Sequence, residues 1–138
     1  MTTVAIYESH PAVLAGLRRR LEAEADLDVV GAYGDLFRFE TAVATHRPDI
    51  VVVSGFGGGA IQAANLAARV DRGMKMLALV PGTRRNERLG FPPTVEFVAD
   101  GPRGDLLVKR VLRLGRSDSG VRRSCRPVTY GPIEAPAR

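Results

Sequence analysis

The chain has 138 residues, of which 45% are hydrophobic and 25% are charged, and this length and composition fit one globular domain rather than a two-domain enzyme. Its single cysteine, Cys125, excludes a disulfide scaffold and a cysteine-based zinc site. The net charge of +5 is unevenly placed: residues 1–108 hold 12 Lys and Arg against 13 Asp and Glu, whereas residues 109–138 hold 8 against 2.

Short β-rich runs alternate with segments of helical periodicity along the chain. Pro11 follows the first run and suits the first position of a helix, and Asp35 is placed to cap another helix. Residues 50–53 form a continuous β-branched run, which is typical of a strand buried on both faces of a parallel sheet. The predicted strands are 4–7, 27–32, 50–53, 74–80 and 95–98, and the predicted helices are 11–21, 36–46, 60–70, 84–89 and 105–114.

This alternation predicts an α/β fold with a doubly wound, five-stranded parallel sheet that has helices on both faces. The fourth helix, at 84–89, is predicted to be short because Gly and Pro interrupt the segment around it. In such sheets ligands bind outside the carboxyl ends of the strands. The candidate site residues at those ends are Glu8, Ser9, Ser54, Val80 and Ala99.

The basic end of the chain is predicted to lie outside the domain. We expect residues 1–115 to form the domain and residues 116–138 to form a flexible basic tail, because the tail is rich in Gly, Ser, Pro and Arg and lacks apolar periodicity. The tail shows no helix-turn-helix pattern. Contact between its positive charge and the phosphates of nucleic acid stays open as an alternative.

No segment is predicted to cross a membrane, because glycines interrupt the long uncharged run at 50–70. The N-terminus lacks the basic region of a signal peptide, so we expect a cytoplasmic protein with no membrane partner.

Two stretches carry a resemblance to a known family. One is Tyr7-Glu8-Ser9-His10-Pro11, and the other is Arg47-Pro48-Asp49-Ile50-Val51-Val52-Val53. In this order and spacing the chain resembles, over about residues 3–114, the receiver domain of two-component response regulators of the LuxR (NarL/FixJ) type. The resemblance implies a flavodoxin-like, CheY-like receiver fold and a role in phosphorelay signal transduction and transcription regulation. It also implies that DNA is reached only indirectly or through a separate effector domain.

The residues that carry the family's chemistry are altered in this chain. In the family, an acidic pair after the first strand holds Mg²⁺, an aspartate ending the third strand accepts the phosphoryl group, and a hydroxyl and a lysine end the fourth and fifth strands. Here the corresponding residues are Glu8 with Ser9, then Ser54, Val80 and Ala99. One carboxylate beside two hydroxyls is a poor site for a hard divalent cation. We therefore predict an atypical receiver domain with no metal, no cofactor, no phosphoryl acceptor and no enzymatic activity.

Individual residues at this edge also have simpler interpretations. Glu8 is either a lone metal ligand or a solvated strand-end carboxylate, and we favour the second. Ser54 is more simply a small strand-end residue than a nucleophile, since no base is placed beside it. The loop after it matches a dinucleotide fingerprint, but no acidic residue ends the next strand, so we expect a flexible loop. A small-ligand site stays open as an alternative, using Glu8, Ser9, Ser54 and the loop glycines Gly55, Gly57, Gly58 and Gly59.

The resemblance also implies a dimer surface on the first and last helices, where receiver domains commonly pair. In this chain the edges of that surface would include Val13, Leu17, Leu107 and Val111. A homodimer or contact with another protein is therefore the expected mode of action.

Overall fold

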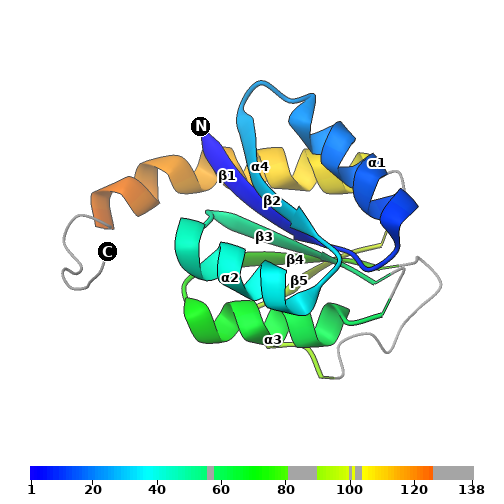
Figure 1. The fold of residues 1–138 in the computed structure, drawn as a ribbon. Coiled ribbons are helices and arrows are strands. Elements are labelled where there is room, and N and C mark those ends of the chain that lie inside the picture. The colour runs from blue at the N-terminus through cyan, green and yellow to red at the C-terminus, as the bar shows by residue number, and fades with distance from the viewer. Residues whose placement is uncertain (56–57, 81–89, 100, 102–103, 126–138) are drawn as a thin grey trace.

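A five-stranded parallel sheet forms the centre of the fold (Figure 1). The computed structural model describes residues 1–55, 58–80, 90–99, 101 and 104–125, with the backbone alone for 117–125. The strand order is β2-β1-β3-β4-β5, and all four pairings are parallel, which confirms the predicted α/β fold. The elements are β1 Thr2–Tyr7, α1 Pro11–Glu22, β2 Leu27–Tyr33, α2 Leu36–His46, β3 Ile50–Ser54, α3 Ala60–Val70, β4 Lys75–Val80, β5 Glu96–Ala99 and α4 Asp105–Cys125.

Helices cover both faces of the sheet, α1 and α4 on one face and α2 and α3 on the other (Figure 1). Alternate residues of β1 point to opposite faces, so Ile6 packs in the cluster under α1 and α4 and Tyr7 in the cluster under α2 and α3. All five residues of β3 are buried. The β-branched run at 50–53 is therefore enclosed on both faces, as predicted.

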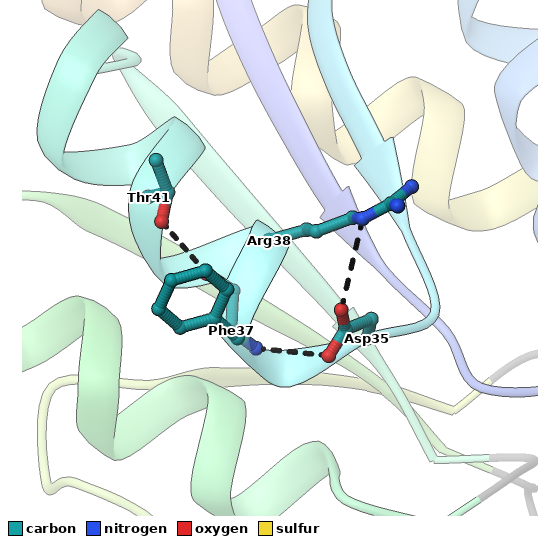
Figure 2. A network of polar contacts seen from close by, with 4 residues as sticks. All are labelled: Asp35, Phe37, Arg38 and Thr41. Atoms are coloured by element: carbon teal, nitrogen blue, oxygen red, sulfur yellow. Dashed lines mark hydrogen bonds and ion pairs between the residues drawn. The ribbon is translucent and has the colours of Figure 1, made fainter.

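The helix starts follow the predicted signals. Helix α1 begins at Pro11. Helix α2 is capped by Asp35, whose Oδ1 accepts a hydrogen bond of 3.1 Å from the N–H of Phe37 (Figure 2). The same carboxylate lies 3.8 Å from Nε of Arg38, and the hydroxyl of Thr41 donates to the carbonyl of Phe37 at 2.9 Å. Because these groups are exposed, they define where α2 starts more than they stabilise the fold.

The end of α4 differs from the prediction. The expected helix stopped at residue 114, but the backbone stays helical to Cys125, through residues 116–125 of the predicted basic tail. Gly115 resembles a helix stop in the sequence, yet it lies inside α4 against β1. A Cβ at this position would lie 2.6 Å from Oγ1 of Thr2. The glycine thus permits close contact between helix and strand.

Two other predicted segments have different outcomes. The short helix expected at 84–89 and the tail residues 126–138 lie outside the described residues. Strand β5 begins at Glu96 and ends at Ala99, one residue later than predicted at each end. None of the described helices is long and apolar enough to cross a membrane.

Candidate functional site

The carboxyl ends of β1, β3, β4 and β5 meet at one edge of the sheet. Tyr7 pairs with Val53, so the next residues along each strand, Glu8 and Ser54, lie beside one another. At the other side of the edge Val80 pairs with Ala99. The fold therefore places the candidate strand-end residues of all four strands along a single edge.

Glu8 is buried rather than solvated, which corrects the sequence interpretation. Its exposed fraction is 0%. Oε2 accepts a hydrogen bond of 2.8 Å from the N–H of His10, the residue that precedes α1. The carboxylate thus binds at the start of a helix, where free N–H groups and the helix dipole favour negative charge. Oε1 has no hydrogen-bond partner among the described residues.

Ser54 ends β3 and is also fully buried. Its hydroxyl has no hydrogen-bond partner in the described part of the chain. Most buried polar side chains in proteins are paired, so two unpaired polar atoms on neighbouring strand ends are unusual. The hydroxyl is a donor and Oε1 of Glu8 is an acceptor, and the two groups have complementary chemistry. A water bridge or a rotation of either side chain would satisfy both.

The glycine loop after β3 is held against the end of β1. The hydroxyl of Ser9 accepts a hydrogen bond of 2.8 Å from the N–H of Gly58, and the hydroxyl of Tyr7 donates to the carbonyl of Gly58 at 3.1 Å. Gly59 has a φ of 89°, and a Cβ there would lie 2.3 Å from the Tyr7 hydroxyl oxygen. Only glycine fits this position without strain.

These contacts correct the expected flexible loop and reduce the support for the alternative, a ligand site at its glycines. A backbone cradle for a ligand needs N–H groups that are not already bonded. The N–H of Gly55 donates to the carbonyl of Leu79 at 2.7 Å, and that of Gly58 donates to Ser9. Gly57 lies outside the described residues. Two of the four proposed glycines therefore have their donors engaged inside the protein.

Tyr7 is the residue of this edge that sequence analysis missed. Burial raises the pKa of its hydroxyl, and the nearby charges of Glu8 and then Asp35 act in the same direction, while a hydrogen bond with Ser9 opposes them. Its ring packs edge-on against Phe39 with centroids 5.6 Å apart. The only sequence signal for this role was an aromatic residue directly before the Glu8-Ser9 pair.

The remaining candidates, Val80 and Ala99, bring neither a hydroxyl nor a cation to the edge. Val80 is 4% exposed and packs in the α2–α3 core cluster, whereas Ala99 is exposed. Within the described residues no group of three or more His, Cys, Asp or Glu side chains is arranged to hold a metal ion. The edge therefore offers one buried carboxylate, one buried hydroxyl and a docked glycine loop.

The proposed dimer surface is contradicted at three of its four residues. Leu17, Leu107 and Val111 are 0% exposed, because they fill the core between the sheet and helices α1 and α4. Val13 is half-buried against the same cluster. These side chains stabilise the domain and cannot contact a second copy. The exposed apolar residue on α4 is instead Leu106.

Several solved structures share this fold. The signal receiver domain of a modulated diguanylate cyclase from Desulfovibrio desulfuricans G20 matches with a TM-score of 0.67 and 19% identity, over 88% of this chain and 98% of that one. The response regulator TrrA from Thermotoga maritima, in complex with Mg²⁺ and beryllium fluoride, matches with a TM-score of 0.66 and 15% identity, over 83% of this chain and 99% of that one. The NarL signal receiver domain from Mycobacterium tuberculosis matches with a TM-score of 0.64 and 20% identity, over 83% of this chain and 96% of that one.

No protein-family model matches the sequence, and neither does any curated protein sequence. The structural likeness extends over most of this chain and almost all of each of these three domains. The chain therefore has the fold of a response regulator receiver domain.

Proposed function

We propose that this chain is a cytoplasmic receiver domain that accepts no phosphoryl group and acts through contacts with a protein partner or a second copy, in signal transduction that regulates transcription. The domain is a binding module in this proposal and not an enzyme. Recognition of a DNA sequence belongs to a separate effector domain, as in the LuxR-type regulators that the sequence resembles.

The observation that carries the proposal is the buried serine at the end of β3. The resemblance places the phosphorylated aspartate at this position, where Ser54 is 0% exposed. A phosphoryl donor must reach the accepting oxygen in line with its leaving group. An enclosed hydroxyl does not allow that approach, and Val80 and Ala99 supply no group to stabilise the charge that develops on the phosphoryl oxygens.

Mg²⁺, which the resemblance implies, does not fit the residues present. Mg²⁺ prefers six oxygen ligands in octahedral geometry and is usually held by carboxylates together with several waters. Glu8 is the carboxylate of this edge, one of its oxygens is bonded to the N–H of His10, and the side chain has no solvent exposure. The second acidic position is Ser9, whose hydroxyl is bonded to Gly58.

A small-ligand site at the same edge has less support. Glu8 and Ser54 are enclosed, and the N–H groups of Gly55 and Gly58 are already bonded. A ligand would have to break these contacts before it could bind.

Phe37 supports a role in protein contacts. It lies in the first turn of α2 and is 73% exposed, next to the Asp35–Arg38 ion pair (Figure 2). Exposed aromatic side chains bordered by charges are typical of protein interfaces. If a homodimer forms through Phe37, the variant Phe37→Ser should dissociate at a higher protein concentration than the natural chain. Sedimentation velocity over a concentration series measures this. Arg69→Ser, on α3, is the control and should dimerise like the natural chain.

Intact mass measurement after incubation with acetyl phosphate and Mg²⁺ tests the central part of the proposal. We expect no phosphoryl adduct on the natural chain. The variant Ser9→Asp/Ser54→Asp/Ala99→Lys restores the second acidic residue, the aspartate and the lysine of the family but keeps Val80. It serves as the comparison and is expected to gain one adduct. Any phosphoryl adduct on the natural chain would contradict the proposal, and its resistance to hydroxylamine would assign it to a hydroxyl such as that of Ser54 rather than to a carboxylate.

A further inference from the structure

We propose that the exposed face of α4 binds the phosphate backbone of double-stranded nucleic acid without reading its sequence. We call the exposed residues Lys109, Arg113 and Arg116 the basic face. This inference is independent of the phosphoryl pocket, because the basic face and the carboxyl edge use different residues.

The helical register of α4 gathers these charges. Lys109, Arg113 and Arg116 are spaced four and three residues apart, so they follow one another along one side of the helix. The opposite side packs on the sheet, where Leu107 and Val111 are fully buried. The basic face is therefore directed to solvent along the part of α4 that the sheet holds in place.

Two acidic groups near the basic face are paired with arginines of the fold. Asp105, at the start of α4, forms an ion pair of 2.6 Å with Arg20 of α1. Glu96 of β5 is paired with Arg110, on another side of α4. The Arg20–Asp105 pair also shows that α1 lies beside α4, and α1 carries the exposed Arg19 on the same layer of the molecule. Asp26 lines the same pocket as Arg116, so the excess of positive charge is at Lys109 and Arg113.

The correction at the end of α4 extends this geometry. Because the backbone stays helical to Cys125, α4 continues beyond the sheet (Figure 1). From Lys109 to Arg116 the rise along the helix is about 10 Å, enough to reach several phosphates of a duplex.

The composition of α4 favours a duplex backbone over other partners. The helix has no aromatic residue on which an unpaired base could stack, and no Asn or Gln to read adenine. A membrane-surface helix must insert an apolar side into lipid, but the apolar side of α4 is buried against the sheet. Contacts of Lys and Arg with phosphates position a protein on a duplex and carry no sequence information.

Fluorescence anisotropy with a short labelled DNA duplex tests the proposal on the full chain. Three phosphate contacts predict a slope of about −3 for log K against log salt. The variant Lys109→Gln/Arg113→Gln removes two charges and should make this slope shallower by about 2. The matched control Arg69→Gln/Arg72→Gln removes two exposed charges near the end of α3 and should leave the slope unchanged. Thermal unfolding checks that both variants are folded.

Equal affinity for a second duplex of unrelated sequence would support the proposal. No binding at low salt would overturn it, and so would an equal change of the salt slope in the α3 control. A strong preference for one of the duplexes would also overturn it, as would tighter binding to polyglutamate or to phosphatidylserine vesicles than to the duplex. Tighter binding to polyglutamate would point to an acidic protein partner, and tighter binding to vesicles would point to a lipid surface.

Discussion

At the amino ends of β1 and β3, the carboxylate of Asp49 accepts hydrogen bonds from the N–H and the hydroxyl of Thr3, at 3.0 and 3.2 Å. At the carboxyl ends of the same two strands, Oε1 of Glu8 and the hydroxyl of Ser54 have no partner among the described residues. Both edges belong to one sheet and are built on the same pair of strands. They differ in whether the fold satisfies the polar groups that it encloses.

The two edges of the sheet therefore contribute differently to stability. A buried polar group without a partner costs about 1–3 kcal/mol, so the carboxyl edge lowers the stability that the amino edge and the core provide. Departures of this kind concentrate at functional sites. The amino edge pairs its polar groups, whereas the carboxyl edge leaves Oε1 of Glu8 and the hydroxyl of Ser54 without a partner among the described residues.

The largest expected effect is at the loop that docks on the carboxyl edge. Gly59→Ala should lower the free energy of unfolding by about 2 kcal/mol, because the new Cβ requires a left-handed backbone and collides with Tyr7. The neighbouring Gly58→Ala is the control, since no atom lies within 4 Å of its Cβ position. Urea denaturation measures both, and equal effects would mean that the loop does not dock as described.

At the amino edge the close contact is between α4 and β1. Gly115→Ala should lower the free energy of unfolding by about 1 kcal/mol, because overlap with Thr2 outweighs the better helix propensity of alanine. Gly16→Ala in α1, which meets nothing within 4 Å, should instead stabilise by about 0.5–1 kcal/mol. The same denaturation assay compares the two glycines. A stabilising Gly115→Ala would contradict the packing of α4 on β1.

Replacing each of the two serines of the carboxyl edge by alanine should change the free energy of unfolding in opposite directions. Ser54→Ala removes a buried hydroxyl without a partner and should raise the free energy of unfolding by up to about 1 kcal/mol. Ser9→Ala removes the acceptor for the N–H of Gly58 and should lower it by about 1 kcal/mol. If Ser54→Ala is the more destabilising of the two, Ser54 has a partner and the contrast between the edges is lost.

The smallest expected effect is a pH dependence from Tyr7. Its pKa is raised in the folded state, so the unfolded chain ionises first as the pH increases. The contribution of Tyr7 is therefore fully present below about pH 10, the ordinary tyrosine pKa, and is lost as the pH rises from there through the folded-state pKa. Stability measured across this range should fall less steeply in Tyr7→Phe. An unchanged slope would show that Tyr7 is not enclosed.

The fold was predictable because its signals are local and repeated. The β-branched run before Ser54, the capping residue Asp35 and the proline at the start of α1 each indicate an element that the structure contains. Parallel strands then place the candidate residues at one edge without knowledge of any side-chain contact.

What the sequence could not show depends on contacts between distant segments. Burial of Glu8 arises because α1 begins directly above it, and Gly115 is enclosed because Thr2 lies against it. The same reason explains why residues expected at the edge of a dimer surface are buried. Helical periodicity places Leu17 and Leu107 on apolar sides but does not say whether the sheet or another protein covers them.

An NMR titration with Mg²⁺ and beryllofluoride, which mimics an acyl phosphate, tests the central claim most directly. The amides of Gly55, Gly58 and Ala99 report on the glycine loop and on the end of β5. The proposed function predicts no saturable shift of these amides at millimolar ligand, because Ser54 and Ala99 stand where the family has its aspartate and lysine, and the described residues offer no site for the metal. Saturable shifts that extend from the loop to β5 would contradict it and show that a phosphoryl-type switch operates in this chain.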